Sequence, residues 1–318
     1  MPKLIIQIPC LDEEATLPRT LADLPREVDG FDRVEWLVID DGSRDRTVEV
    51  ARAHGVDHVV RLPVHRGLAT AYQAGLDAAL KLGADVVVNT DADNQYRGAD
   101  VPRLVAPILA GRADLVVGDR EVRTSAHFSA RKRGLSRLGS WLVRRASSTQ
   151  VADAASGFRA LNREAAIRTH VVSTYTYTLE SLIAAGRAPV AVEHVAVGTN
   201  PDTRPSRLFP SLWTYVRRNG LSIFRIYAQH EPLRVFLIGA LLVGLAGVAL
   251  AFTSLIAGAV LLGVAALLVG LGVIGDLLYA QRVLTQRALE RARRIELELG
   301  VPPSHHETGA GNGHPVRR

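Results

Sequence analysis

The segment Val86-Val87-Val88-Asn89-Thr90-Asp91-Ala92-Asp93-Asn94-Gln95 is the most informative stretch of this chain. A β-branched run that ends in alternating acids is typical of a buried strand with two carboxylates at its C-terminal tip. In open α/β sheets, ligands bind along that edge. Carboxylate and amide oxygens are hard ligands that suit Mg²⁺ or Mn²⁺. A solvated turn is the alternative for this segment alone, because Asp and Asn are common in turns.

Apolar runs and helical patterns alternate on both sides of this segment. The runs that predict strands are 3–8, 35–39, 58–61, 85–89 and 115–117. The patterns that predict helices are 16–24, 47–54, 68–82 and 101–110. Such alternation predicts an α/β fold of the Rossmann-like kind, with a mainly parallel sheet and helices on both of its faces.

Three of the predicted strands end in acidic segments. These segments are Pro9 to Glu14, Asp40 to Thr47 and Asp91 to Gln95. In a parallel sheet they lie along one edge and can surround one ligand. A helix cap would explain Asp40 and Asp41 alone, but it does not explain three such strand ends in succession.

The C-terminal third contains an uncharged run from Val235 to Gly275. One helix of that length would span about 60 Å, which is twice the thickness of a hydrocarbon core of about 30 Å. We therefore expect two transmembrane spans with a turn near Thr253-Ser254. Recurring glycines in both spans would permit close helix packing, and a homo-oligomer through this hairpin is possible. So long a run without charge disfavours a soluble hydrophobic hairpin.

Basic residues flank the hairpin on both sides, from Arg217 to Arg234 and from Arg282 to Arg294. The positive-inside rule therefore predicts that the N-terminal domain and both termini are cytoplasmic. The apolar run Leu4 to Ile8 is too short for a signal peptide. We expect a protein integral to the cytoplasmic membrane. The basic, aromatic segment before the hairpin predicts interfacial amphipathic helices, with a core helix packed on the sheet as the alternative.

The expected organisation has five parts. A catalytic-type α/β domain covers 1–204, and amphipathic juxtamembrane helices cover 205–233. The transmembrane hairpin covers 234–279, with spans at about 235–253 and 256–278. A charged cytosolic helix covers 280–299, and a disordered tail rich in Gly, Pro and His covers 300–318.

The charge of the chain is unevenly distributed. Of the 318 residues 22% are charged and the net charge is +6, with many arginines between Arg120 and Arg145. Such a patch suits phosphate groups, although a solvated helix face is the alternative. Nucleic acid is not expected as a partner, because no nucleic-acid-binding motif accompanies the patch. Cys10 is the only cysteine, so no intrachain disulfide can form.

Several motifs resemble those of family 2 glycosyltransferases with the GT-A fold. They are Asp40 to Thr47, Gly67 to Gly75, Asp91 to Gln95, Val117 to Arg120, Arg133 to Arg137, Asp153, and Ser156 to Arg159. More narrowly, the chain is similar to polyprenyl-phosphate glycosyltransferases of the dolichyl-phosphate mannose synthase type. The resemblance covers roughly residues 3 to 210. The sequence departs from the family pattern at Asp12, at Asp119 and in the short segment Arg204 to Arg207.

The resemblance implies roles for individual residues. Those implied to line the base and ribose pocket are Pro9, Leu11, Glu13 and Asp41. Those implied to meet the ribose and diphosphate are Asp91, Ala92 and Asp93. Asp93 and Gln95 are implied to hold Mg²⁺ or Mn²⁺. Those implied to meet donor or acceptor phosphates are Arg120, Arg133, Arg204 and Arg207. Asp93, Arg120, Arg133 and Asp153 are the residues expected to take part in catalysis.

The implied reaction is inverting transfer of a hexose from a UDP- or GDP-linked sugar to a polyprenyl phosphate in the bilayer. A phosphate acceptor is already ionised at neutral pH and needs no strong general base. The first alternative is a lipid alcohol or cell-envelope glycan acceptor, for which Asp153 is the nearest candidate base. The second is a membrane-anchored scaffold on an inactive fold, against which the intact Asp91, Asp93 and Gln95 argue.

Overall fold

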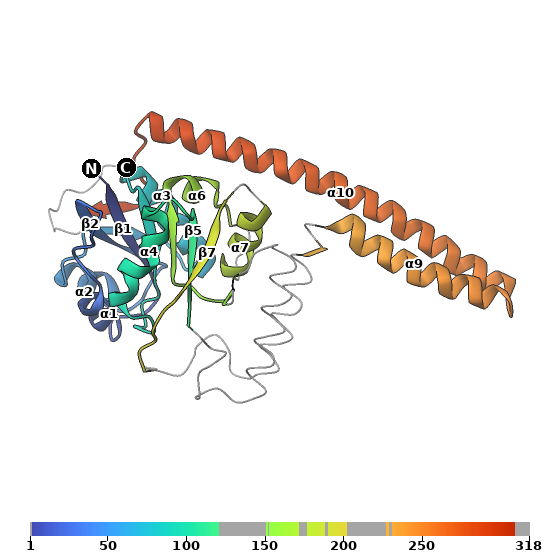
Figure 1. The fold of residues 1–318 in the computed structure, drawn as a ribbon, viewed down its shortest axis with the longest axis horizontal. Helices are drawn as coiled ribbons and strands as arrows, with labels where there is room; N and C mark the ends of the chain where they lie inside the picture. The colour runs from blue at the N-terminus through green and yellow to red at the C-terminus, as the bar shows by residue number, and fades with distance from the viewer. Residues whose placement is uncertain are drawn as a thin grey trace. The chain divides into compact units, whose positions relative to one another are not determined.

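The computed structural model describes residues 2–120, 151, 153–171, 177–187, 190–201, 227–228 and 231–308. The chain divides into two compact units (Figure 1). The first unit comprises Met1–Thr214 together with Arg293–Arg318, and the second comprises Tyr215–Ala292. Most of the predicted juxtamembrane segment, 205–233, lies outside the described residues.

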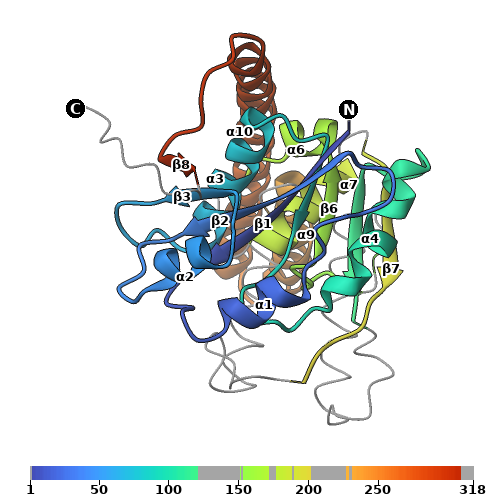
Figure 2. The same ribbon diagram turned by 90° about the vertical axis from the view of Figure 1, so that its left-hand side faces the viewer.

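The five predicted strands are all present in one sheet of the first unit. They are β1 (Lys3–Cys10), β2 (Arg33–Asp40), β3 (His58–Arg61), β4 (Val86–Asn89) and β5 (Leu115–Asp119). The sheet order is β7-β5-β6-β4-β1-β2-β3-β8 (Figure 2). β1 pairs in parallel with both β2 and β4. The parallel core of the predicted α/β fold is therefore confirmed.

Three further strands were not expected from the sequence. They are β6 (Arg159–Asn162), β7 (Val192–Ala196) and β8 (His306–Thr308). β6 is inserted antiparallel between β4 and β5, whereas β7 pairs in parallel with β5. β6 and β7 are short and mix polar with apolar residues, and β8 is three polar residues, so their local patterns carry little strand signal. Backbone pairing with the neighbouring strands β4, β5 and β3 stabilises them instead.

Helices cover both faces of the sheet. The predicted helices are present as α1 (Leu17–Asp23), α2 (Thr47–Ala53), α3 (Leu68–Lys81) and α4 (Val101–Leu109). The elements η1 (Gly98–Asp100), α6 (Arg163–Arg168) and α7 (Tyr177–Arg187) are additional. Ile6 and Ile8 of β1 belong to the core cluster formed with α1, α2 and α4. Because side chains alternate along a strand, Gln7 faces the side on which α3 packs.

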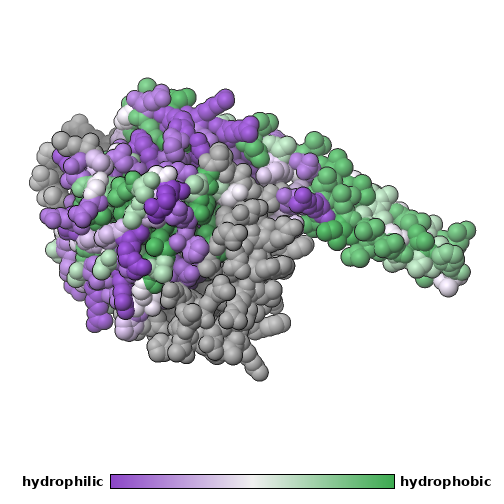
Figure 3. All heavy atoms as spheres, viewed as in Figure 1, coloured by the Kyte–Doolittle hydropathy of each residue, from purple (hydrophilic) through white to green (hydrophobic). Residues whose placement is uncertain are grey.

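The second unit contains the apolar helix α9 (Pro232–Ala251) and most of α10 (Leu255–Glu298). The turn between them falls at the predicted Thr253-Ser254. The helices pack closely through glycines: a Cβ added at Gly258 would lie 2.5 Å from Ala251 Cβ. Leucines cover the outer surface of the hairpin, which is hydrophobic in Figure 3. Both helices are long and apolar enough to cross a membrane.

The chain from 276 onward differs from the prediction in two ways. The predicted cytosolic helix 280–299 is not separate, because α10 continues through it as far as Glu298. The prediction of disorder from 300 is wrong for His306–Thr308, which pair with the edge strand β3. His306 Nε2 lies 3.1 Å from His58 Nδ1, and Glu307 pairs with Arg52. Composition predicts disorder here because it does not register backbone pairing and ion pairs with distant residues. Residues 309–318 lie outside the described part.

Within the first unit, charged contacts join the end of α10, from Arg293 onward, to α6. Arg293 Nη1 donates to the carbonyl oxygens of Ala166, Ile167 and Thr169 at the end of α6, at 2.9–3.2 Å. Arg294 makes two hydrogen bonds to the carboxylate of Glu164, at 2.9 and 2.7 Å. An arginine at the C-terminal end of a helix satisfies its free carbonyl groups and its dipole.

These contacts predict that Arg293→Ala destabilises the protein. Removing a charged donor from three carbonyls should lower the free energy of unfolding by about 2–4 kcal/mol. Arg291 is exposed on the same helix, so Arg291→Ala is the matched control and should change it by less than about 0.5 kcal/mol. Thermal unfolding of the detergent-solubilised full chain measures both. Equal stabilities of the two variants would contradict this account of the α10 end.

Candidate active site

The candidate site lies at the edge of the sheet where the parallel strands end. β1, β2, β3 and β4 run in one direction, as do β5 and β7. β6 runs the opposite way between β4 and β5, so its beginning lies at the same edge as their ends. The segments that follow β1, β2, β4 and β5, and the segment that precedes β6, therefore meet there. These segments contain the predicted motifs.

The predicted metal motif forms a tight turn after β4. Gln95 N–H donates to Asp93 Oδ1 at 3.0 Å, and Asn94 adopts a left-handed φ of 57°. The Ala92 carbonyl accepts a hydrogen bond from Thr20 Oγ1 of α1 at 2.9 Å. Asp91, Asp93 and Gln95 are half-buried. The turn is thus held in place by the protein around it rather than being simply solvated.

Arg120 joins this turn to the segment before β6. Its Nε donates to Asp153 Oδ2 at 2.7 Å and its Nη2 donates to Asp153 Oδ1 at 3.2 Å. Its Nη1 donates to Gln95 Oε1 at 3.3 Å. The structure therefore brings Gln95, which the strand-tip pattern placed at this edge, together with Arg120 and Asp153, whose roles came from the resemblance. A two-point guanidinium–carboxylate pair fixes the plane of the arginine head.

Gly157 closes the space on the other side of Asp91. A Cβ added there would lie 3.0 Å from Asp91 Oδ1 and 2.7 Å from Tyr177 Oη. The Gly157 N–H donates to Tyr96 Oη at 2.9 Å, and its carbonyl accepts from Asn89 Nδ2 at 2.8 Å. The absence of a side chain at this position leaves room for the Asp91 carboxylate.

The loops after β1 and β2 are connected by hydrogen bonds. Glu13 N–H donates to Thr47 Oγ1 at 2.9 Å. The two oxygens of Asp41 accept from the backbone N–H groups of Arg66 and Gly67, each at 2.8 Å. His65 Nδ1 also lies 2.8 Å from Asp41. Asp41 therefore fixes the loop between β3 and α3.

The remaining predicted residues differ in how far the structure describes them. Pro9 is buried in β1 and Leu11 is half-buried directly after it. Both lie beside the end of β2, because Cys10 pairs with Asp40 in the register of the two strands. The other three, Arg133, Arg204 and Arg207, lie outside the described residues.

The electrostatics of the site centre on Asp91. Burial, and then the neighbouring charge of Asp93, raise the pKa of the Asp91 carboxyl to about 7. A buried carboxylate next to a second acid is an environment that a divalent cation relieves. Gln95 adds an amide oxygen to the same turn. These oxygen donors fit Mg²⁺ or Mn²⁺. Among the described residues, no group of three or more His, Cys, Asp or Glu side chains is arranged to hold a metal.

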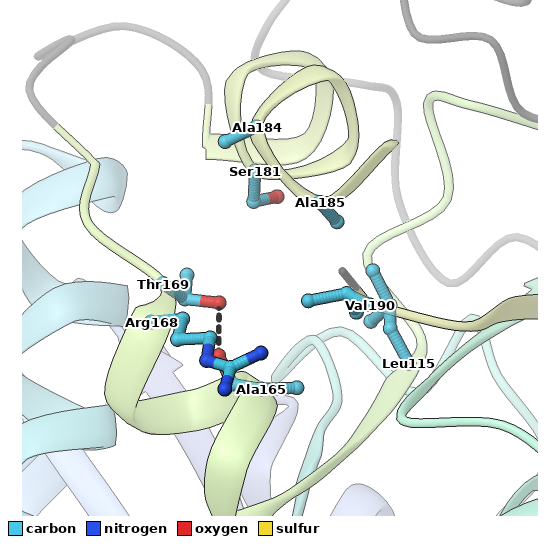
Figure 4. Close-up of a pocket in the computed structure, with 8 residues that line it drawn as sticks. All are labelled: Leu115, Ala165, Arg168, Thr169, Ser181, Ala184, Ala185 and Val190. Atoms are coloured by element: carbon cyan, nitrogen blue, oxygen red, sulfur yellow. Dashed lines mark hydrogen bonds between the residues drawn. The ribbon is translucent and has the colours of Figure 1, made fainter. Parts of the chain in front are cut away.

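A small hollow elsewhere in the first unit does not belong to this site. It lies between α6 and α7 and is lined by Leu115, Arg168 and Thr169, among others (Figure 4). Leu115 begins β5, whereas Arg120 directly follows the end of that strand. The hollow is therefore at the opposite end of β5 from Arg120.

Comparison with known proteins agrees with this geometry. Residues 5–169, more than half of the chain, match the family model described as glycosyl transferase family 2. This chain belongs to family 2 of the glycosyltransferases.

Similar proteins include both uncharacterised and named members. An uncharacterized glycosyltransferase from Mycobacterium tuberculosis is 35% identical over 199 residues, covering 62% of this chain and 85% of that protein. The polyprenol monophosphomannose synthase of Mycolicibacterium smegmatis is 32% identical over 167 residues, covering 50% and 62%. A solved structure of glucosyl-3-phosphoglycerate synthase from Mycobacterium tuberculosis, with Mn²⁺, UDP-glucose and phosphoglyceric acid, has 25% identity and a TM-score of 0.54. It covers 70% of this chain and 79% of that one.

The residues that the sequence did not single out form buried hydrogen bonds around the turns at Asp91–Gln95 and 153–157. They are Asn89, Tyr96, Gly157, Arg159 and Tyr177. Gly157 and Arg159 stand in a motif that supported the family resemblance, but no role followed from it. The clearest available signal was the polar Asn89 at the end of the apolar run Val86 to Val88.

The raised pKa of Asp91 predicts a pH-dependent stability. An acid whose pKa is higher in the folded state binds more protons there, so its contribution to stability falls as pH rises from about 4 to about 7. In EDTA at pH 8 we expect Asp91→Asn to be more stable than the unsubstituted protein by about 1–3 kcal/mol. Near pH 4 the difference should vanish.

Thermal unfolding at the two pH values measures this difference. Adding Mn²⁺ at pH 8 should stabilise the unsubstituted protein more than the variant. A variant that is no more stable at pH 8 would show that the Asp91 carboxylate is not desolvated beside Asp93.

Proposed function

We propose that this chain transfers a hexose, with inversion, from a UDP- or GDP-linked sugar to a polyprenyl phosphate in the membrane. The observation that carries the proposal is the Arg120 head, which is held by Asp153 and Gln95 beside the Asp91–Asp93 pair. One edge of the sheet thus offers oxygen ligands for a cation next to a fixed cation for a phosphate. The apolar hairpin adds a means of reaching a lipid acceptor.

The donor half of the reaction would depend on the turn after β4. Asp93 and Gln95, supported by Asp91, would hold a Mg²⁺ or Mn²⁺ ion. When bound, that ion would neutralise the charge that develops on the leaving diphosphate. The solved glucosyl-3-phosphoglycerate synthase structure with Mn²⁺ and UDP-glucose supports this use of a metal. Pro9, Leu11 and Glu13, with the loop fixed by Asp41, would line the base and ribose pocket.

The acceptor half would depend on arginines. A phosphate acceptor is already ionised at neutral pH, so its oxygen can attack without a strong general base. Arg120 would bind that phosphate in a fixed orientation, because Asp153 holds its guanidinium plane. Arg133 is proposed to bind it as well, from the basic segment that follows β5 in the sequence. The name of the Mycolicibacterium smegmatis relative supports a polyprenol acceptor.

The membrane hairpin favours a lipid over a soluble acceptor. The structural neighbour is named for a soluble acceptor that also carries a phosphate, so the site alone fits both kinds. We propose that the hairpin lies in the cytoplasmic membrane with the catalytic domain and both termini in the cytoplasm. The basic residues on both sides of the hairpin support this orientation.

The proposal predicts which acceptor this enzyme uses. The purified full chain with Mn²⁺ should release UDP or GDP from its donor rapidly only when polyprenyl phosphate is present. Asp93→Ala should lower this rate by roughly 100-fold or more, because a ligand of the proposed metal is lost. Coupled nucleotide release, with the glycolipid product identified by mass, measures both rates.

Two acceptor controls decide between the alternatives. Polyprenol without phosphate tests the alcohol acceptor, and 3-phosphoglycerate tests the soluble acceptor. If either matched polyprenyl phosphate, the proposed acceptor class would be wrong. If Asp93→Ala released UDP or GDP at the normal rate, the assignment of Asp93 as a metal ligand would be wrong.

The arginine assignment predicts a selective defect. A charged hydrogen bond to phosphate is worth about 1.5–3 kcal/mol, so Arg133→Ala should raise the apparent KM for polyprenyl phosphate roughly 10- to 100-fold. Donor affinity should be nearly unchanged. The measurement is steady-state kinetics in detergent that contains no anionic lipid. If Arg133 bound only anionic lipid headgroups, the defect of the variant would shrink under these conditions. Arg120→Ala should be less selective, because Arg120 also contacts Gln95.

A further inference from the structure

Arg159 is the largest fully buried side chain in the described part of the chain. It is the first residue of β6, and it pairs in register with Asn89 of β4 and Val117 of β5. Its Nε donates to the Ser156 carbonyl at 2.9 Å and its Nη2 to the Ala154 carbonyl at 3.0 Å. Its Nη1 donates to Ser181 Oγ of α7 at 2.8 Å. All three partners are neutral.

Such burial is energetically unfavourable. Moving a cation out of water costs several kcal/mol of free energy. Hydrogen bonds to neutral groups offset less of this cost than a bond to a carboxylate would. Burial also lowers the pKa of the Arg159 guanidinium. A Met side chain would fill a similar volume in the sheet without this cost. Packing alone therefore does not account for an arginine at this position.

The hydrogen bonds of Arg159 converge on the turn that precedes β6. The Ala154 and Ser156 carbonyls lie on either side of Ala155, directly after Asp153. Asp153 in turn holds Arg120, and Arg120 donates to Gln95. A continuous series of contacts thus runs from Arg159 to the proposed metal ligand Gln95.

A second series of contacts reaches Asp91 through the same turn. Gly157 follows Ser156 and lies against Asp91, where a Cβ would come within 3.0 Å of the carboxylate. Asn89 holds the Gly157 carbonyl and also donates to Tyr177 Oη, at 3.0 Å. Ser181, the α7 partner of Arg159, donates to the Tyr177 carbonyl at 2.6 Å. Any change in the shape of the 153–157 turn would therefore displace groups on both sides of the candidate metal.

We infer that Arg159 is a positioning residue that holds the 153–157 turn in the shape required by Arg120, Gln95 and Asp91. It would act from the buried side of the turn, through these groups, without touching metal or substrate. The inference rests on the proposed metal- and nucleotide-dependent function, but it does not depend on which acceptor is used. A guanidinium is suited to this task, because its planar fork can bind three acceptors in fixed directions.

The test compares three variants of the full chain in detergent. Arg159→Met removes the charge and all three hydrogen bonds, while Arg159→Lys keeps the charge but not the fork. Arg163→Met is the matched control, since Arg163 makes a single hydrogen bond to the Ala84 carbonyl beyond the other end of β6. The probes are Mn²⁺ with UDP and Mn²⁺ with GDP, and binding is measured by calorimetry alongside thermal unfolding. Donor turnover is measured separately.

We expect Arg159→Met to weaken binding of the Mn²⁺–nucleotide complex roughly 10- to 100-fold, the loss typical of groups that orient metal ligands. Its kcat should fall as well. The affinity of Arg159→Lys for Mn²⁺–nucleotide should lie between those of Arg159→Met and the unsubstituted protein, because one ammonium group cannot reach all three acceptors. Arg163→Met should bind normally even where it lowers thermal stability. That pattern separates positioning from a general loss of folding.

Ser181→Ala keeps the inference testable if Arg159→Met does not fold. Of the three Arg159 hydrogen bonds it removes only the one from Nη1, together with the bond from Ser181 Oγ to the Tyr177 carbonyl. We expect binding to weaken about 2- to 5-fold. The inference is overturned if folded Arg159→Met, or Ser181→Ala in its place, binds Mn²⁺–nucleotide as tightly as the unsubstituted protein. It is also overturned if Arg163→Met shows an equal loss. Failure of the unsubstituted protein to use polyprenyl phosphate would reject the proposed acceptor while leaving these binding results intact.

Discussion

The burial of the Asp91 carboxylate beside the charge of Asp93 is the constraint around which the site is arranged. The parallel pairing of β1 with β2 and β4 brings several acidic strand ends to one edge of the sheet. Burial at that edge makes the negative charge of Asp91 costly, as its raised pKa shows. Two arginines counteract this cost, because the charges of Arg120 and Arg159 both act to lower the pKa of Asp91. A divalent cation would complete this compensation. Substrate phosphates would then bind where the protein has already concentrated its cations.

The sequence predicted the part of this arrangement that depends on local pattern. The run Val86 to Val88 is apolar and β-branched, so β4 and the position of Asp91 at its tip followed directly. β6 was not predicted, because only two apolar residues lie between Arg159 and Asn162. The strand forms by pairing with β4 and β5. The buried contacts of the site were missed for the same reason. The hydrogen bond from Asn89 to Gly157 joins residues 68 positions apart, and no local pattern encodes it.

The C-terminal part shows the same division between local and long-range signals. The hairpin was predictable, because an uncharged run of that length has few alternatives in a protein. The continuation of α10 and the strand β8 were not. Arg293 is one of several arginines in a charged helix, and only the structure singles it out as the one that binds the end of α6. His306 is one of two adjacent histidines in a polar segment, yet it contacts His58 at the sheet edge. Both contacts lie within the unit that contains the site, and they join its C-terminal segment Arg293–Arg318 to the α/β domain.

The position of Asp153 bears on the nature of the acceptor. An alcohol acceptor would need a base, and Asp153 is the carboxylate that the motif offers. Both of its oxygens, however, accept hydrogen bonds from Arg120. Accepting a proton would neutralise Asp153 and weaken its hold on Arg120 while negative charge is still present at the site. The two tasks therefore compete within one side chain. A phosphate acceptor avoids this conflict. It is already an anion, so Asp153 need not remove a proton from it and can keep Arg120 in place. The observed geometry is thus better suited to a phosphate acceptor than to an alcohol.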